Sequence, residues 1–111
     1  MQMTMATEER LDRRFTALAD PTRRELIARL SRRSLRAGEL CRGLPMSRPA
    51  VSKHLRVLRE AGLVDAKKQG RTQVYRLAEG GIRDVTSYIE RVGRGWDRAL
   101  EAFKRYTEEE R

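Results

Sequence analysis

The sequence has few of the residues that build disulfides, metal sites and aromatic pockets. Among 111 residues there is one cysteine, Cys41, and one histidine, His54, and aromatic residues make up 5% of the chain. A single cysteine excludes an intramolecular disulfide. A soft-metal site normally needs three or four strong ligands, which one cysteine and one histidine cannot supply. We therefore expect no metal ion and no cofactor.

Long apolar runs and catalytic motifs are missing as well. No stretch approaches the ~18 apolar residues that span a bilayer, and residues 1–14 are polar, without the core of a signal peptide. The cytoplasm is therefore the expected compartment, with no membrane contact. The sequence lacks a Gly-rich phosphate loop, and one histidine with one cysteine offers no nucleophile–base pair, so an enzyme is not expected.

Charge is abundant by contrast, and its sign varies along the chain. Charged residues make up 37% of the sequence, and the net charge is +9. Residues 42–76 carry nine Lys or Arg and two Asp or Glu, a net charge of +7, whereas residues 1–41 carry +3 and residues 77–111 carry −1. Positive charge concentrated in one third of a chain is typical of a protein that binds a polyanion.

The N-terminal part of the chain is predicted to hold two helices. Apolar side chains recur at helical spacing over residues 8–19. Asp20 and Pro21 then end this helix and start a second one at residues 22–30, because Asp is a good N-cap and Pro suits the first helical position. Residues 31–35 are polar and are expected to form a loop.

The next segment is predicted to form a helix-turn-helix. A short helix at residues 37–44 is followed by a tight turn at Pro45-Met46 and by a longer helix, which Ser47 caps and Gly62 ends. The apolar side chains of the longer helix fall on one stripe: Val51, Leu55, Leu58 and Ala61. In DNA-binding proteins built this way, the second helix enters the major groove.

The opposite face of the longer helix carries polar and basic side chains that can contact DNA. Arg48 and Lys53 are the best candidates for base edges, because both can donate to guanine O6 and N7. Arg56 lies a turn further on and is expected to meet phosphate, and for His54 a packing or phosphate role is favoured over a pH switch. The predicted DNA-binding residues of this helix are Ser47, Arg48, Pro49, Ala50, Ser52, Lys53, His54 and Arg56.

A β-hairpin is predicted directly after this helix. Residues 63–68 and 73–77 have the apolar content of short strands, and residues 69–72 provide the turn. A basic hairpin in this place is a wing, which can lie along phosphates or reach into the minor groove, and a merely soluble turn is the alternative. The predicted DNA-binding residues of the wing are Lys67, Lys68, Gln69, Arg71, Thr72 and Gln73.

The last segment, residues 81–108, is predicted to form one long helix with a heptad pattern. Its apolar side chains are separated by alternating steps of three and four: Ile82, Val85, Ile89, Val92, Trp96, Ala99, Phe103 and Tyr106. Such a seam needs a partner surface, and so small a chain cannot cover all of it. Gly93 and Gly95 weaken a helix by up to ~1 kcal/mol each, so we expect close packing or a bend there.

Two stretches of the sequence resemble a known family. FTALADPTRRELIARL and AGELCRGLPMSRPAVSKHLRVLREAGLVDAKKQGRTQVYRL, within about residues 11–77, resemble the ArsR family of bacterial winged-helix repressors. The resemblance implies a homodimer built on the first and last helices, which represses transcription by occupying a promoter, often its own. The residues then expected in the dimer interface are Leu11, Phe15, Ile89, Val92, Trp96, Ala99 and Phe103.

Many members of that family release DNA when a metal binds, and this sequence departs from their metal sites. The commonest thiol site is a Cys-x-Cys on the short helix, whereas Cys41 here is followed by Arg42 and Gly43. The other site uses carboxylates and histidines of the last helix, and residues 81–111 contain no histidine. The tail, with GWDRALEAF, resembles the branch without a metal site. We therefore expect no metal sensing and interpret Cys41 as a buried core thiol.

Together these features predict one winged helix-turn-helix domain over residues 1–111, mainly α with a small β-hairpin (α+β), in the order ααααββα. Its parts are the N-terminal helices (8–36), the helix-turn-helix (37–61), the wing (63–77) and the dimerisation helix (81–108). The expected function is sequence-specific binding of double-stranded DNA by a homodimeric repressor. Two alternatives stay open: a sequence-neutral DNA-coating protein, and a repressor released by an unidentified small ligand, with Trp96 lining a pocket between subunits.

Overall fold

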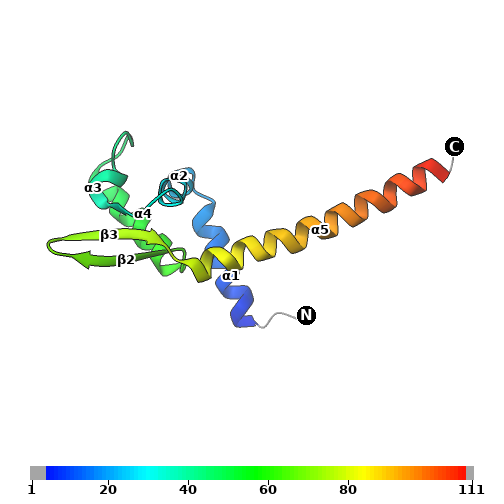
Figure 1. Ribbon diagram of the computed structural model, residues 1–111, viewed down its shortest axis with the longest axis horizontal. Helices are drawn as coiled ribbons and strands as arrows, with labels where there is room; N and C mark the ends of the chain where they lie inside the picture. The colour runs from blue at the N-terminus through cyan, green and yellow to red at the C-terminus, as the bar shows by residue number, and fades with distance from the viewer. Residues whose placement is uncertain (1–4, 110–111) are drawn as a thin grey trace.

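The computed structural model describes residues 5–109, which form mainly helices and one small sheet. Figure 1 shows most of the elements gathered at one end, while α5 projects away as a single long helix, and the molecule extends over 67 × 33 × 21 Å. The predicted mainly helical fold with a hairpin and a long last helix is confirmed. The elements in chain order are α1 (Met5–Leu18), α2 (Pro21–Leu30), β1 (Leu35–Arg36), α3 (Ala37–Leu40), α4 (Arg48–Glu60), β2 (Val64–Gln69), β3 (Thr72–Leu77) and α5 (Glu79–Glu109).

The sheet has one strand more than predicted. β1 pairs antiparallel with β3, with Leu35 opposite Tyr75 and Arg36 opposite Val74, and β2 pairs with the other edge of β3. The predicted loop at residues 31–35 is therefore wrong at its end. A strand of two residues has no alternating pattern to detect, and it forms because β3, far along the chain, offers it a free edge.

The short helix α3 ends at Leu40 rather than at Leu44, so its predicted length is wrong. The reason lies in α2, where Arg29 Nη1 donates to the carbonyl oxygens of Leu40 (2.9 Å) and Arg42 (2.7 Å). A side chain from outside the helix satisfies these carbonyls, so the helix need not continue past them. Cys41 is left in the turn, half-buried against the core rather than fully buried as expected.

Two expectations for the outer helices need correction. α1 begins at Met5 instead of Glu8, and α5 runs through Gly93 and Gly95 without a break (Figure 1), so the predicted bend is wrong. Each glycine weakens a helix by up to ~1 kcal/mol, which does not end a helix of this length. A Cβ atom at either position would meet no heavy atom of the chain within 4 Å. The close packing expected there is therefore not made inside one described chain.

The predicted cap of α2 is confirmed. Asp20 Oδ1 accepts hydrogen bonds from the backbone amides of Thr22 (2.8 Å) and Arg23 (3.1 Å), and Pro21 occupies the first helical position. The bond from the Arg23 amide is the main cause that lowers the pKa of Asp20, because it favours the charged carboxylate. The cap thus fixes where α2 starts and how it leaves α1.

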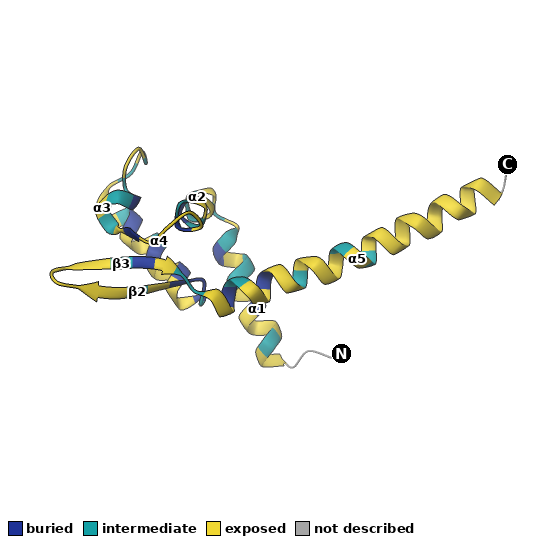
Figure 2. Cartoon of the chain, viewed as in Figure 1, coloured by how far each residue is buried: buried dark blue, intermediate teal, exposed yellow. Residues whose placement is uncertain are grey.

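The core lies where α2, α4, the sheet and the first turns of α5 meet. Figure 2 shows buried residues concentrated there, whereas the projecting part of α5 is mostly exposed, with a few half-buried positions. The core therefore holds the inner face of α4 rigidly. Its largest fully buried side chains are Leu26, Leu40, Val51, Leu55, Leu58, Leu63 and Val64.

Candidate nucleic-acid interface

The helix α4 has one buried and one exposed face. Ser47 Oγ accepts a hydrogen bond from the Ala50 amide (3.3 Å) and caps the helix as predicted. Val51, Leu55 and Leu58 on the inner face are at most 1% exposed. Because the inner face is locked in the core, the opposite face must point to solvent. Among the predicted DNA-binding residues, that exposed set is Ser47, Arg48, Pro49, Ser52, Lys53 and Arg56.

The two other predicted residues of this helix, Ala50 and His54, are half-buried. His54 Nδ1 lies 3.3 Å from Arg23 Nη1, and Arg23 Nε donates to the carbonyl oxygen of Ala17 (2.6 Å). A guanidinium can only donate, so this contact is a hydrogen bond in the tautomer whose Nδ1 accepts. His54 therefore packs against the start of α2, which favours the packing role over the pH switch.

The hairpin of β2 and β3 projects from the end of the molecule opposite to the C-terminal part of α5 (Figure 1). Its loop is Gly70-Arg71, and Gly70 has a φ of 62°, a backbone conformation that favours glycine. Thr72 Oγ1 donates to the Gln69 carbonyl (3.2 Å), which closes the tip. All the predicted wing residues are exposed: Lys67, Lys68, Gln69, Arg71, Thr72 and Gln73.

The wing and α4 form one surface, because β2 packs directly against α4. A groove of about 470 Å³ at this junction is lined by both charges, from Arg56, Arg59 and Glu60 of α4 and from Val64, Asp65 and Ala66 of β2. Tyr75 donates from its hydroxyl to Gln73 Oε1 (3.2 Å), which holds that wing side chain above the sheet. Exposed cations thus lie on α4 and, further along the hairpin, at Lys67, Lys68 and Arg71.

A second surface runs along α5. Large apolar side chains are exposed there. Removing such surface from water would stabilise the protein by about 25 cal/mol per Å² of apolar area. Exposed apolar patches of this kind mark surfaces that contact another protein. Ala99, also predicted at the interface, is exposed, whereas Phe15 is half-buried and Leu11 only 6% exposed within its own chain. The large side chains are Ile89 (55% exposed), Val92 (40%), Trp96 (66%), Leu100 (55%), Phe103 (64%) and Tyr106 (59%).

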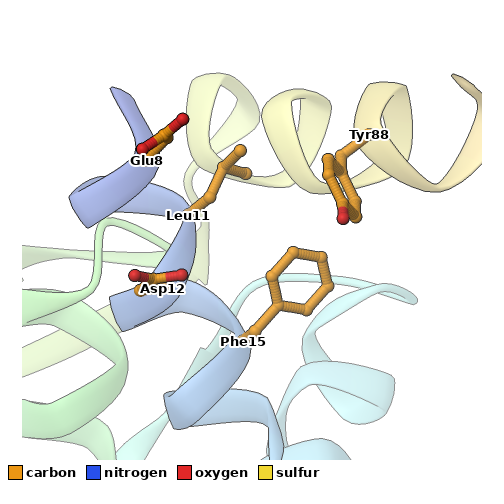
Figure 3. Close-up of a pocket in the computed structure, with 5 residues that line it drawn as sticks. All are labelled: Glu8, Leu11, Asp12, Phe15 and Tyr88. Atoms are coloured by element: carbon orange, nitrogen blue, oxygen red, sulfur yellow. The ribbon is translucent and has the colours of Figure 1, made fainter. Parts of the chain in front are cut away.

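A pocket of about 310 Å³ lies between α1 and α5 (Figure 3). Phe15 and Tyr88 face each other across it, edge to face, with ring centroids 5.3 Å apart and an interplanar angle of 65°. Leu11 completes its apolar part, and Glu8 and Asp12 lie at its rim. Trp96 does not line this pocket, which adjoins the apolar surface of α5.

Three residues of α1 and α5 were not singled out from the sequence. Leu100 and Tyr88 lie off the heptad seam, so periodicity gave no reason to choose them. Arg14 of α1 contacts Ala61 and Asp84, which are 47 and 70 positions away, and one arginine among many carries no signal for such contacts. The surroundings of these residues are found only when the chain is folded.

The described part of the chain, residues 5–109, contains no group of three or more His, Cys, Asp or Glu side chains that could hold a metal ion. Within the same residues, no helix is both long and apolar enough to cross a bilayer.

Known proteins are similar to this chain in both sequence and fold. Residues 20–66 match the family described as bacterial regulatory protein, arsR family. The chain is 42% identical over 106 residues to the HTH-type transcriptional regulator Rv2034 of Mycobacterium tuberculosis, with 96% of each chain covered. It superposes on the solved ArsR-like transcriptional regulator from Rhodococcus sp. RHA1 with a TM-score of 0.73 and 39% identity, over 91% of this chain and 95% of that one.

A further solved structure is the homodimeric winged helix-turn-helix DNA-binding domain of a possible ArsR-family transcriptional regulator from Mycobacterium bovis. Its TM-score is 0.66 and its identity 27%, with 86% of each chain covered. The similarity to these proteins extends over nearly the whole chain, so it includes α4, the hairpin of β2 and β3, and most of α5. The chain belongs to the ArsR family of bacterial regulatory proteins and is a DNA-binding transcriptional regulator, not an enzyme.

Proposed function

We propose that this protein is a homodimeric repressor, which reads a specific DNA sequence with α4 and holds the flanking backbone with the wing. The observation that carries the proposal is the division of α4 into a face at most 1% exposed (Val51, Leu55 and Leu58) and an outer face of exposed cations and hydroxyls. A rigid helix with hydrogen-bond donors on its exposed face suits the major groove. In that groove, each base pair presents a distinct pattern of hydrogen-bond donors and acceptors. Repression follows from occupying a promoter.

The side chains of α4 take different roles by their place on the helix. Arg48 and Lys53, near the capped end, donate to guanine O6 and N7, and Ser52 reaches base or phosphate. The amides at the Ser47 cap face a phosphate, since a helix N-terminus favours anions. Arg56, one turn further on, neutralises backbone charge. These assignments give α4 both base readout and backbone contacts.

The wing adds affinity rather than most of the sequence readout. Lys67, Lys68 and Arg71 are exposed cations at the hairpin tip, where Arg71 follows the turn glycine. Arginine is favoured in a narrow minor groove, and lysines release counterions when they meet phosphates. The wing therefore contacts the backbone or the minor groove beside the segment that α4 reads.

The dimer is proposed to form through α5, with support from α1. The exposed side chains from Ile89 to Tyr106 form a seam longer than the rest of the chain can cover, and the relative from Mycobacterium bovis is a homodimer. Two copies of α4 would then meet two half-sites about one helical turn apart, roughly 34–36 Å. The protein would act in the cytoplasm, where bacterial DNA lies.

Control by a metal is not part of the proposal, since the described residues offer no ligand cluster and Cys41 stands alone. A small ligand that releases DNA is a second way to regulate such a repressor. The pocket beside Phe15 and Tyr88 lies on the helices of the proposed interface, so the second copy is its expected neighbour.

The experiment is a selection of bound duplexes from a random pool, together with the region upstream of the protein's own gene. The proposal expects a preferred sequence with two inverted half-sites, called here the selected duplex. Arg48→Ala and Lys53→Ala should change the bases preferred, and a matched loss of charge at Arg10→Ala on α1 should not. A pool that stays random would contradict specific binding and favour a sequence-neutral DNA-coating protein.

A further inference from the structure

One arginine of α1 joins three helices. Arg14 Nε donates to the carbonyl oxygen of Ala61, at the C-terminal end of α4, at 3.1 Å. Its Nη1 forms an ion pair of 2.5 Å with Asp84 Oδ2, in the second turn of α5. The Arg14 side chain is 12% exposed and Asp84 55%, so the junction lies at the edge of the core. A single guanidinium thus connects the recognition helix to both helices of the proposed dimer interface.

The chemistry of the contact suits a fixed orientation. The last carbonyls of a helix lack partners within it, and the helix C-terminus carries partial negative charge, so a cation there is stabilising. A guanidinium is a planar fork whose donors have fixed relative directions, unlike a lysine ammonium. Arg14 donates with Nε to the end of α4 and with Nη1 to α5. Because both donors belong to one rigid plane, these two bonds restrain the position of α4 relative to α5.

The backbone around the junction leaves little freedom for α5. A Cβ atom at Gly81 would lie 1.8 Å from the carbonyl oxygen of Gly62, the residue after the α4 cap. The Ala78 amide donates to the Leu63 carbonyl at 2.9 Å. A Cβ atom at Gly62 would lie 3.1 Å from Arg14 Nη2. The end of α4 is therefore enclosed by the start of α5 on one side and by Arg14 on the other.

The contact between α1 and α4 is otherwise open on one side. A groove of about 500 Å³ lies between the two helices, lined among others by Thr16 and Val57. Val57 is 37% exposed there, so apolar side chains do not close this side of the contact, although Ala17 and Ala61 are buried beside it. The hydrogen bond from Arg14 to Ala61 crosses between the same helices and adds a directional constraint to that packing.

We infer that Arg14 is a positioning residue for DNA binding, which sets the placement of α4 relative to the dimer axis and so the spacing of half-sites that the protein accepts. The inference rests on the proposed function, because spacing matters only when two copies of α4 bind one duplex. Arg14 does not touch DNA in this account. It acts through the peptide at Ala61 and through Asp84.

The test compares the selected duplex with the same duplex in which one half-site is scrambled. Arg14→Met should weaken binding to the selected duplex by about tenfold and to the single half-site by less than about twofold, because misaligned sites lose the gain of simultaneous contact. Adding or removing one base pair between the half-sites should lower the affinity of Arg14→Met by a smaller factor than it lowers the affinity of the parent protein. Light scattering should still show a dimer. A loss of stability alone would not change the preferred spacing.

Two further variants separate positioning from charge. Arg10→Met removes the same charge from α1, where Arg10 is exposed and donates to Thr7 Oγ1 of its own helix, and it should leave the ratio between the two duplexes unchanged. Asp84→Asn raises the net charge by one, so a purely electrostatic effect would tighten binding to every duplex. The inference expects instead a lower ratio of selected duplex to half-site, in the direction of Arg14→Met.

An intact Arg14→Met dimer with the parental ratio and the parental spacing preference would overturn the inference while leaving specific binding in place. If Arg14→Met does not fold, Arg14→Lys and Asp84→Asn take its place in the test. The inference expects both to lower the ratio of affinity for the selected duplex to affinity for the single half-site. A random pool that yields no selected duplex would overturn this inference together with the proposed function.

Discussion

At the scale of single residues, Ser47 has a structural role that can be separated from DNA contact. Its Oγ accepts from the Ala50 amide at the start of α4. We expect Ser47→Ala to lower the free energy of unfolding by about 1 kcal/mol, the usual cost of losing an N-cap. Urea unfolding measures this, with Ser52→Ala, exposed on the same helix, as a control that stays within about 0.5 kcal/mol of the parent. Equal stability of the two variants would show that the Ser47 bond does not stabilise α4.

Arg48 and Arg56 should differ in the kind of affinity they supply. Arg48→Ala is expected to cost about 1–3 kcal/mol on the selected duplex and far less on scrambled DNA, because it removes base readout. Arg56→Ala should weaken binding to both duplexes and reduce the slope of log K against log salt by about one. Fluorescence anisotropy over a salt series separates the two cases. The assignment of roles would be refuted by identical behaviour of the two variants.

The residue roles that could be predicted from the sequence are those that depend on near neighbours. Ser47 as a cap and the stripe of Val51, Leu55 and Leu58 follow from spacing within one helix, and both are confirmed. The sequence left the role of His54 open between packing and phosphate contact, because the residue next to it in the structure, Arg23, lies on a different helix. Exposure of Arg48 and Lys53 agrees with the prediction, but contact with bases stays a prediction until DNA is bound.

At the scale of elements, the junction of α4 and α5 depends on one backbone contact. A Cβ atom at Gly81 would meet the Gly62 carbonyl oxygen at 1.8 Å, whereas one at Gly80 would meet nothing within 4 Å. We expect Gly81→Ala to destabilise the protein by several kcal/mol or to displace α5, since the obstacle is backbone and cannot rotate away. Gly80→Ala should be neutral or stabilise by up to about 1 kcal/mol, because alanine favours helix.

Thermal unfolding of the two glycine variants, monitored by circular dichroism, makes the comparison. They differ by one position in the first turn of α5, so their helix propensities change equally. A Gly81→Ala protein as stable as Gly80→Ala would contradict the close approach of α5 to Gly62.

The elements show where prediction from sequence stopped and why. Helices of ten residues or more show a periodic pattern of apolar residues, so the bounds of α1, α2, α4 and α5 were predicted to within a few residues. The strand β1 has two residues and depends on β3, and the end of α3 depends on Arg29 of α2. Both errors arise from contacts between segments distant in sequence, which no local pattern contains.

At the scale of the whole molecule, α5 leaves large apolar side chains exposed in the single chain. Its projecting part exposes Trp96 and Phe103 by 66% and 64%. We expect a dimer at micromolar concentration by light scattering, and a monomer for the double variant Trp96→Glu with Phe103→Glu, because two buried carboxylates cannot be desolvated without partners. Arg94→Glu, on the opposite side of the heptad, should remain dimeric.

The double variant should keep its helical content and lose the tight binding to the selected duplex, since one α4 contacts one half-site. A parent protein that stays monomeric at micromolar concentration would refute the dimer, and the Arg94→Glu control guards against an effect of charge alone. The heptad seam predicts that α5 pairs with a second copy, and this stays a prediction. The contact of Tyr88 with Phe15 could not be predicted, because it depends on how α1 lies against α5.

The proposed function requires that α4 reads base sequence and not only the charge of the DNA backbone. Fluorescence anisotropy on the selected duplex and on a scrambled duplex of equal length, at two salt concentrations, distinguishes the two. We expect an affinity ratio of about 10³ or more at physiological salt, which falls for Arg48→Ala and Lys53→Ala. Equal affinity for both duplexes, falling steeply with salt for parent and variants alike, would contradict it.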